Sequence, residues 1–476
     1  MSTTPDTAVT PIDPTPAAEL AALDNAAVSS ESVVGTAPSR AELAAREDAA
    51  VASESVVGTA SSRAELAARE DAAAAAESVV GTAPSRAELA AAGERRIAWI
   101  RTRMGMLANL RERFAAERPF EGITIGLSLH VEPKTAVLVE TLAAGGARIV
   151  GTGNHGSTQD DVVAALQERG MTIFGRRDDS IEEHHRNLAR TIAERPQILL
   201  DNGADLAALA VTEGLSGSLI GGTEETTSGA FRLREEMNGE VPFPVIVIND
   251  SPLKAIGENK HAVGQSAVES FMRLTNVQVP GRRFVVAGYG WCGRGIAQYL
   301  RALGGRVSVA EVDELAAYEA AFDGFRVAPL ADLVPSADVI ITATGRAGIL
   351  TAEHFDLLRD GTILGNIGHF PWEIDVPALT AAGTVAPVTE EIDAVTLDED
   401  RTVYLLTGGR MYNLAGTAPR GNSIESMDVG FMMQALSLER IALHAANLPT
   451  GPQPVPDDIN RDIARQTLTL LGSSLA

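Results

Sequence analysis

The sequence predicts an α/β protein with two doubly wound parallel-sheet domains and a low-complexity arm of helical repeats at its N-terminus. Three observations predict this class. Apolar strand-like runs alternate with helix-like segments from about residue 96 and again from about residue 265, which is typical of parallel sheets covered on both faces. A glycine-rich loop joins a strand to a helix in the second stretch. The first 95 residues instead repeat an alanine-rich unit.

The repeated unit begins as ESVVGTAPSRAELAAREDAAVAS at Glu31 and starts again at Glu54 and Glu77, a period of 23 residues. Each unit contains a break and then a predicted helix whose N-cap serine has a glutamate three residues later. The pairs are Ser39 with Glu42, Ser62 with Glu65 and Ser85 with Glu88. Short alanine-rich helices bury little surface and are marginal alone. We interpret residues 1–92 as a flexible arm, either an interaction or spacer array or a duplication without a chemical role.

Composition and charge exclude several classes of function. The 476 residues suffice for two or three domains, and the formal charge of -24 argues against a nucleic-acid-binding surface, which needs a basic patch. The single cysteine, Cys292, excludes an internal disulfide and fits a reducing compartment. No secretory signal and no apolar window of membrane-spanning length is present. These features predict a soluble cytoplasmic protein without nucleic-acid or membrane partners.

In the first α/β stretch, polar side chains stand where predicted strands end. The strands are ITIGLSLHV, ARIVGTG, MTIFG and the start of PQILLDNGADL, and KTAVLVETLAAGG and STQDDVVAALQERG are helices between them. Ligands bind at the carboxyl ends of the strands of an open α/β sheet. The candidate ligand-binding residues at these ends are His130, Asn154, His155, Asp201 and Asn202.

The second stretch carries a dinucleotide-binding pattern. The strand RRFVVAG leads into Gly288, Gly290 and Gly293, and the helix IAQYLRALGG follows. The next strand, RVSVAEVD, has Glu311 near its end, about 20 residues after Gly290. DVIITATG and TILGNIG supply two more strands. A carboxylate at this position accepts hydrogen bonds from ribose hydroxyls and repels a 2'-phosphate, while the helix N-terminus binds the pyrophosphate. The pattern therefore predicts NAD rather than NADP.

Seven sequence blocks, in order, resemble the S-adenosylhomocysteine hydrolase family from about residue 96 to about residue 445. They are LSLHVEPKTAVLVETLAAGGA, STQDDVVAAL, GGTEETTSG, VIVINDSPLKAIGEN, VVAGYGWCGRG, NIGHF and GGRMYNLA. LHVEPKTAVLV and GYGWCGRG are more similar to the archaeal and thermophile branch, and the eukaryotic C-terminal tail with its lysine and tyrosine is lacking. The resemblance implies a substrate domain at 93–262, an inserted Rossmann NAD domain at 263–422 and a return to the substrate domain at 423–476.

The resemblance also implies the chemistry and a homo-oligomer, either a dimer or a tetramer. In the family, NAD oxidises the 3'-hydroxyl of a nucleoside, which acidifies the 4' C–H. Loss of that proton expels the 5' substituent, water adds to the enone, and the hydride returns. NAD is regenerated in each cycle and should stay tightly bound. No metal is implied.

Site residues follow from the resemblance, position by position. Lys254 matches the lysine that takes the 3'-hydroxyl proton, Asn259 matches the family's asparagine, and Glu258 stands where aspartate is usual. Glu225 matches the glutamate that holds the ribose hydroxyls, and His130 matches an acid/base near the 5' carbon. The remaining matches are a histidine near the ribose and contacts to the nicotinamide end of NAD, namely His369, Thr226, Thr227, Ser228 and Asn413.

Departures from the family pattern cluster on the substrate side. Asn202 stands where the family has an aspartate for acid/base work at the 4' and 5' carbons, and an amide cannot take that proton. Asn422 replaces a histidine, and His155 occupies a position that is usually apolar. Residues 260–262, Lys-His-Ala, replace the usual Arg/Leu-Tyr-Gly. The NAD half keeps the family pattern, so the changes suggest an altered substrate or an altered fate of the intermediate.

Three functions remain open from the sequence. The first is hydrolysis of S-adenosylhomocysteine or a close analogue such as the inosyl form, with His130 or His155 replacing the missing carboxylate. The second is an NAD-dependent nucleoside dehydratase that eliminates the 5' group, such as water, and gives a 4',5'-unsaturated sugar. The third is a non-catalytic NAD-binding regulatory protein that uses its repeats to bind a partner.

Overall fold

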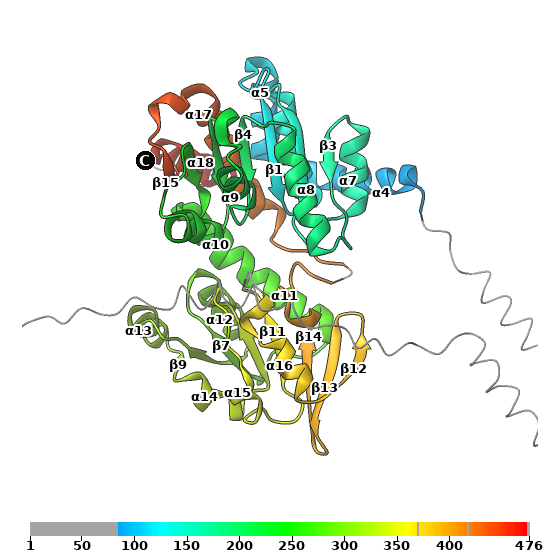
Figure 1. The fold of residues 1–476 in the computed structure, drawn as a ribbon. Coiled ribbons are helices and arrows are strands. Elements are labelled where there is room, and N and C mark those ends of the chain that lie inside the picture. Colours follow the sequence, from blue (N-terminus) through cyan, green and yellow to red (C-terminus); the bar gives the residue numbers. More distant parts are fainter. Residues whose placement is uncertain (1–83, 369–370, 417, 474–476) are drawn as a thin grey trace, which may run out of the picture. The chain divides into compact units, whose positions relative to one another are not determined.

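The computed structural model describes residues 84–368, 371–416 and 418–473, and the strands of this part form two sheets (Figure 1). The predicted N-caps Ser39 and Ser62 and the predicted site residue His369 lie outside the described residues. Within the described ranges, no helix is long and apolar enough to cross a membrane. The same ranges contain no group of three or more His, Cys, Asp or Glu side chains that could hold a metal ion.

Sheet A has seven parallel strands in the order β15-β6-β5-β4-β1-β2-β3. Its strands are β1 (Thr124–Leu129), β2 (Arg148–Gly153), β3 (Thr172–Phe174), β4 (Ile198–Asp201), β5 (Gly221–Glu224), β6 (Pro244–Val247) and β15 (Gly451–Pro454). β1 is buried along nearly its whole length, as expected for a central parallel strand covered on both faces. The strand order reverses between β1 and β4, which makes the carboxyl ends of these strands the expected ligand-binding edge.

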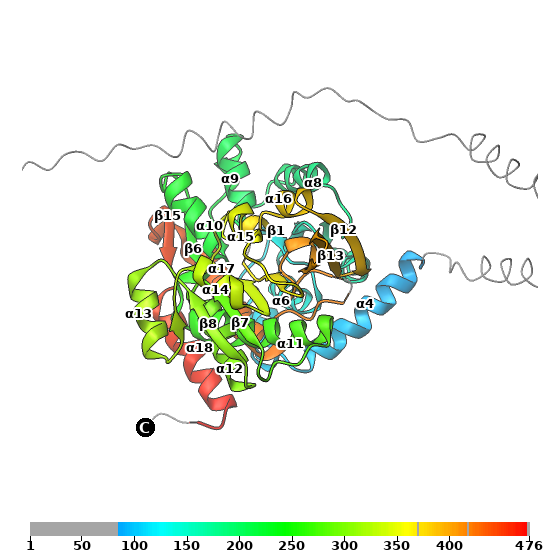
Figure 2. The same ribbon diagram turned by 90° about the horizontal axis from the view of Figure 1, so that it is seen from below.

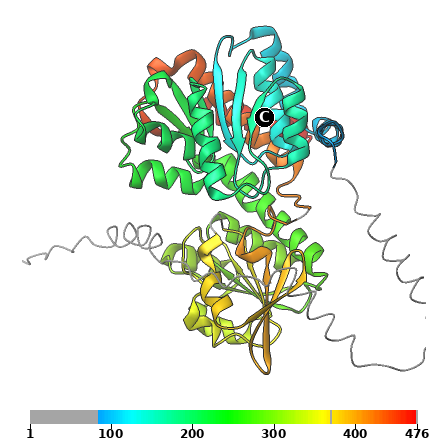
Figure 3. The same ribbon diagram turned by 45° about the vertical axis from the view of Figure 1, so that its right-hand side comes forward.

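Helices cover sheet A on both faces, and the C-terminal helix α17 lies against β4 and β5 (Figure 3). Leu127 of β1 and Met433 and Leu438 of α17 share one buried core. The helices are α4 (Arg86–Arg101), α5 (Gly105–Glu117), α6 (Pro133–Ala144), α7 (Asp160–Glu168), α8 (Ile181–Ala193), α9 (Asp205–Thr212), α10 (Thr227–Phe231), α17 (Ile424–His444) and α18 (Asp457–Leu470). Shorter turns are η1 (Ser216–Ser218), η2 (Arg232–Glu236), η3 (Ile248–Asp250) and η8 (Ala445–Asn447).

The helix of the third repeat is α4, and its predicted capping box is confirmed. Ser85 caps the helix, and the Ser85 N–H donates to Glu88 Oε2 at 2.8 Å. The helix continues without a break to Arg101, so the expected boundary between residues 92 and 93 lies inside it. A Cβ on Gly93 would lie 2.1 Å from the Asp161 carbonyl oxygen of α7. This part of the third repeat is therefore packed against the body of the protein.

Sheet B has eight strands in the order β12-β13-β14-β11-β10-β7-β8-β9. They are β7 (Arg283–Ala287), β8 (Arg306–Ala310), β9 (Arg326–Val327), β10 (Val339–Thr342), β11 (Ile363–Asn366), β12 (Thr384–Thr389), β13 (Ile392–Asp398) and β14 (Arg401–Leu406). Sheet B is mixed at one edge, because β13 runs antiparallel to β12 and β14, and its other neighbouring strands pair in parallel. Two-residue connections join these three strands, and a parallel crossover needs a dozen or more residues.

The helices around sheet B are α11 (Val263–Thr275), α12 (Trp291–Ala302), α13 (Glu314–Phe322), α14 (Leu330–Leu333), α15 (Ala352–Phe355) and α16 (Val376–Ala381), with the short turns η5 (Val334–Ser336), η6 (Pro371–Glu373) and η7 (Thr407–Gly409). α11 continues a π-helix, η4 (Lys254–Ala262), so one uninterrupted helix runs from Lys254 to Thr275. It packs beside α12 (Figure 2). A Cβ on Gly264 would lie 2.7 Å from the Gly295 carbonyl carbon, and one on Gly295 would lie 1.8 Å from the Lys260 oxygen. The two helices therefore touch backbone to backbone.

Candidate active site

A buried lysine between two carboxylates forms the centre of the site. Lys254 is the first residue of η4, and its Nζ lies 2.5 Å from Glu258 Oε1 and 3.3 Å from Glu225 Oε1. All three side chains are buried. Burial alone would lower the pKa of Lys254, but the charges of Glu258 and Glu225 outweigh it and raise that pKa above its usual value. Lys254 is therefore an ammonium group when no ligand is bound.

Glu225 stands directly after β5 and accepts hydrogen bonds from both sides. Asn202 Nδ2, after β4, donates to Glu225 Oε2 at 3.1 Å. Asn154 Nδ2, after β2, donates to Asn202 Oδ1 at 2.8 Å. Burial disfavours the Glu225 carboxylate, but Lys254 and the Asn202 amide lower its pKa below the usual value. Glu225 is therefore ionised, and both polar atoms of Asn202 are engaged.

Glu258 contacts Asn422, the second residue at which the chain departs from the family pattern. Asn422 Nδ2 lies 3.3 Å from Glu258 Oε1. Burial and the nearby Glu225 charge raise the pKa of Glu258. A Cβ on Gly430 of α17 would lie 2.7 Å from Glu258 Oε2, so the glycine leaves space for the longer side chain. The longer carboxylate of Glu258 thus accepts a hydrogen bond from the shorter amide of Asn422, so these two departures from the family pattern form one contact.

His130 lies after β1, where a hydroxyl group holds its ring. His130 Nδ1 is 2.6 Å from Ser157 Oγ, and the Thr135 hydroxyl donates to the His130 carbonyl at 2.6 Å. Burial lowers the pKa of His130, which keeps its imidazole neutral. Ser157 was not predicted as a site residue, although it stands in the quoted block STQDDVVAAL.

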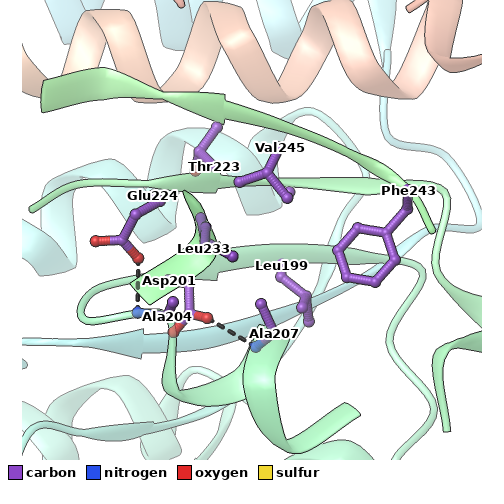
Figure 4. A pocket seen from close by; sticks show the side chains of 10 residues that line it. Leu199, Asp201, Ala204, Ala207, Thr223, Glu224, Leu233, Phe243 and Val245 are labelled. Atoms are coloured by element: carbon purple, nitrogen blue, oxygen red, sulfur yellow. Dashed lines mark hydrogen bonds between the residues drawn. The ribbon is translucent and has the colours of Figure 1, made fainter. Parts of the chain in front are cut away.

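Two buried carboxylates, Asp201 and Glu224, face each other across β4 and β5 and hold the site loops. Asp201 accepts the Ala207 N–H at 2.9 Å, and Glu224 accepts the Ala204 N–H at 2.8 Å (Figure 4). Burial raises the pKa of Asp201 to about 7 and that of Glu224 to about 8. Glu224 was not predicted as a site residue. The small pocket in Figure 4 has no room for a water molecule, so it is packing space and not a ligand site.

The predicted nicotinamide-side residues lie around the start of α10 and the end of β6. Thr226 caps α10, and its hydroxyl donates to Glu224 Oε1 at 2.7 Å and lies 3.0 Å from Ser228 Oγ. The Thr227 hydroxyl and the Asn259 amide both donate to one oxygen, Asn249 Oδ1, at 3.1 and 3.2 Å. Asn249 was not predicted as a site residue, although it stands in the quoted block VIVINDSPLKAIGEN.

Asn413 offers a buried acceptor to a ligand. Its Nδ2 donates to Ser266 Oγ at 3.0 Å, and the Ser266 hydroxyl in turn lies 3.3 Å from Asn422 Oδ1. Asn413 Oδ1 is buried without a hydrogen-bond partner. A buried carbonyl oxygen without a partner is costly unless a donor reaches it. The carboxamide N–H of a nicotinamide is such a donor.

The glycine loop fits a dinucleotide. Gly288 has φ +99°, and a Cβ there would lie 2.9 Å from the Ala343 oxygen, while a Cβ on Gly293 would lie 2.0 Å from the Gly288 oxygen. These two glycines allow the turn and the helix packing. A Cβ on Gly290, the N-cap of α12, would meet nothing within 4 Å, so open space lies where a pyrophosphate can approach. Glu311 directly follows β8, and its Oε2 accepts a hydrogen bond from the Tyr289 N–H at 2.6 Å.

Comparison with known proteins identifies the family. Residues 85–218 match the family model described as S-adenosyl-L-homocysteine hydrolase, and residues 259–419 match its NAD binding domain. S-inosyl-L-homocysteine hydrolase of Methanopyrus kandleri is 44% identical over 80% of this chain and 91% of its own length. The adenosylhomocysteinase of Archaeoglobus fulgidus is 43% identical over 80% and 94%, and that of Thermotoga maritima is 40% identical over 80% and 95%. This chain belongs to the S-adenosyl-L-homocysteine hydrolase family and carries its NAD-binding domain.

Proposed function

We propose that this protein is an NAD-dependent hydrolase of S-adenosylhomocysteine or a close nucleoside analogue such as the inosyl form. The observation that carries the proposal is the buried group of Lys254, Glu225 and Glu258, with Lys254 Nζ within 3.3 Å of both carboxylates. A purely structural ion pair gains little from burial. A ribose with two hydroxyls can accept from the ammonium and donate to Glu225.

Proton transfer at the 3'-hydroxyl uses Lys254 and Glu258 together. When bound, NAD supplies the hydride acceptor for the 3' carbon, with Asn413 and Thr227 at its nicotinamide end. Because Lys254 starts as an ammonium group, it must release a proton before it can act as a base. Glu258 Oε1, at 2.5 Å, is the nearest acceptor for that proton. The amine then takes the hydroxyl proton, while the ionised Glu225 orients the ribose.

At the 5' end, His130 is the group that can exchange a proton. Asn202 occupies the position of the family's carboxylate but cannot titrate. His130 is neutral because burial lowers its pKa. We propose that its imidazole takes the 4' proton and returns it to the departing 5' substituent.

A nucleoside dehydratase is the second candidate, and the contacts of Asn202 favour it. Both polar atoms of this amide are bound, to Asn154 and Glu225. An amide held in this way orients a ligand but does not activate water. Elimination could then occur without readdition of water, which would leave a 4',5'-unsaturated sugar after the hydride returns.

Product analysis separates the candidates. The purified protein is incubated with S-adenosylhomocysteine, with S-inosylhomocysteine and with nucleosides that carry a plain 5'-hydroxyl, and the products are measured by mass spectrometry. Release of homocysteine together with a hydrated nucleoside, adenosine or inosine, supports the hydrolase. A 4',5'-unsaturated nucleoside, lighter by one water than adenosine or inosine, supports the dehydratase. No turnover of any of these substrates, together with no reduction of bound NAD, would contradict both.

We further propose a homo-oligomer in the cytoplasm and a division into an N-terminal arm, a substrate domain that ends at 262 and resumes at 423–476, and an NAD domain (263–422). The arm expected at 1–92 is shortened to 1–83, because α4 runs without a break from Arg86 to Arg101. Light scattering of the purified protein after size-exclusion chromatography tests the oligomer, where a monomeric mass would contradict it. Fractionation of the source cells tests the compartment. Limited proteolysis with mass mapping tests the arm. Cleavage should fall before α4, because residues 92 and 262 both lie inside continuous helices.

A further inference from the structure

The loop between β2 and α7 contacts two residues of the candidate site. Asn154 donates to Asn202, and Ser157 Oγ lies 2.6 Å from His130 Nδ1. The Ser157 hydroxyl also lies 3.2 Å from the Asn154 carbonyl oxygen, to which it donates. The next residue, Thr158, donates its hydroxyl to the same carbonyl oxygen at 3.1 Å. Two adjacent hydroxyls thus share one acceptor, and one of them also contacts the histidine.

The single proton of the Ser157 hydroxyl couples the directions of its two bonds, and the Ser157 backbone N–H also donates to the Asn154 oxygen, at 3.3 Å. A serine hydroxyl has one proton to donate, and a carbonyl oxygen can only accept. If Ser157 donates to the Asn154 carbonyl, the hydrogen bond to the ring must come from an Nδ1–H of His130. With the proton on Nε2 instead, Ser157 would have to donate to Nδ1. Two acceptor oxygens would then face each other at 3.2 Å without a proton between them.

We propose that Ser157 is a positioning residue that holds His130 in the Nδ1–H tautomer, with Nε2 free to accept a proton. No hydrogen bond to Nε2 occurs among the described residues, so this nitrogen is available to a ligand. Burial lowers the pKa of His130, and the charged groups around the ring are Glu225, Lys254 and Lys134. The ring is therefore neutral, and the choice lies between its two tautomers.

The tautomer determines the order of proton transfers, an inference that rests on the proposed function. In the Nδ1–H tautomer, Nε2 carries a lone pair and no proton, so it must act first as a base. Its lone pair forms an N–H bond with the 4' proton, the electrons of the C4'–H bond become the C4'–C5' double bond, and the bond to the 5' substituent breaks. The imidazolium then returns the Nε2 proton to the departing group. Throughout, Nδ1–H remains donated to Ser157.

The chain offers a matched pair of variants. Ser157→Ala and Thr158→Val each remove one hydroxyl donated to the Asn154 carbonyl, but only the first removes the contact to His130. Histidine-selective ¹⁵N labelling reports the tautomer of each of the eight histidines, and a His130→Gln sample assigns the signal. The wild type and Thr158→Val should show His130 as Nδ1–H. Ser157→Ala should show a mixture, and Ser157→Thr should restore the wild-type signal.

Kinetics give a second readout. In Ser157→Ala, the rise of NADH absorbance after substrate addition should stay at the wild-type rate, while elimination slows on the order of tenfold, the loss expected for one hydrogen bond. An Nε2–H signal for His130 in the wild type would overturn the proposal, as would an unchanged signal in Ser157→Ala. Equal slowing by Thr158→Val would show a structural role instead. The NMR experiment reports the tautomer of His130 even if no nucleoside is turned over. Failure of the proposed function can therefore be distinguished from failure of the proposed role of Ser157.

Discussion

The amide of Asn202 donates to the carboxylate of Glu225 across 3.1 Å, so the residue that departs from the family pattern directly contacts the group proposed to hold the ribose. Asn202 therefore has a defined structural role. A carboxylate in its place would face a second carboxylate at the same distance.

We expect Asn202→Asp to increase the ratio of hydrated to unsaturated product, because a carboxylate can deprotonate water and an amide cannot. Two carboxylates this close share a proton, which should raise the apparent pKa of the acid limb by about 1–3 units. The measurement is product analysis across pH. Asn154→Asp is the control, because it adds the same charge without a direct contact to Glu225. If neither the wild type nor Asn202→Asp forms unsaturated product, the dehydratase proposal is wrong. Total inactivity of Asn202→Asp would contradict the role given to this position in both the hydrolase and the dehydratase proposals.

Lys254→Ala should abolish 3'-oxidation, with substrate binding partly retained. Loss of a general base typically costs about 10²–10⁴-fold in rate. The readout is NADH absorbance after mixing with substrate. Lys260→Ala, on the same helix, should keep wild-type absorbance. A Lys254→Ala variant with normal turnover would refute the assignment.

Gly290→Ala and Gly293→Ala should separate cofactor binding from folding. A Cβ on Gly290 meets nothing within 4 Å, whereas one on Gly293 would lie 2.0 Å from the Gly288 oxygen. We expect Gly290→Ala to keep the melting temperature of the NAD-free protein but to copurify with less NAD. Gly293→Ala should lose about 1–3 kcal/mol of stability, as overpacking does. Full NAD content in Gly290→Ala, or better activity with NADP, would contradict the proposed binding mode.

Stability should fall as pH rises from about 4 to about 8 because of Asp201 and Glu224, by the linkage between pKa and folding. Their pKa values in the folded protein are raised to about 7 and about 8 from 3.8 and 4.5. The folded state therefore binds more protons than the unfolded state in this window, and that stabilisation is lost as the pair ionises. Glu224→Gln should flatten the slope of unfolding free energy against pH, although it lowers stability overall. Glu213→Gln, at an exposed carboxylate, is the control and should leave the slope unchanged. An equal slope in Glu224→Gln would contradict the prediction.

Deletion of residues 1–83 should leave turnover and melting temperature nearly unchanged, whereas deletion of residues 1–92 should lower the melting temperature. The longer deletion removes the Ser85 cap and the buried Ala90 of α4. Loss of an N-cap alone costs about 1 kcal/mol. Calorimetry and steady-state assays of both proteins test this. A large loss of activity in the shorter deletion would show a direct role for the repeats.

Local sequence patterns predict the strands that carry the site. β1, β2, β7 and β8 are apolar runs bounded by turns, and the three glycines play the parts that their spacing predicts. β5 and β6 were not predicted as strands. β5, Gly-Gly-Thr-Glu, lacks the apolar run from which the equally short β4 and β10 were predicted, and β6 was noted only as part of the block VIVINDSPLKAIGEN. The antiparallel edge was missed too, although its two-residue connections could have indicated hairpins.

Contacts between distant residues could not be predicted from local patterns. Asn422 and Glu258 are 164 residues apart, and Asn413 and Ser266 are 147 apart. Such pairs depend on how the chain returns from sheet B to α17. The sequence therefore shows two separate departures from the family pattern at Glu258 and Asn422, whereas the structure shows that their side chains are in contact.

The helix from Lys254 to Thr275 has an evolutionary consequence. Because Gly264 and Gly295 bring it into backbone contact with α12, the lysine and the helix that starts at the dinucleotide loop form one fixed unit. The loops after β1, β2 and β4 lie outside that unit. Substitutions in them can select a different 5' substituent while the spacing between the base and the cofactor loop stays constant. A duplicated gene could thus acquire a new substrate by loop mutation and keep the ancestral redox step.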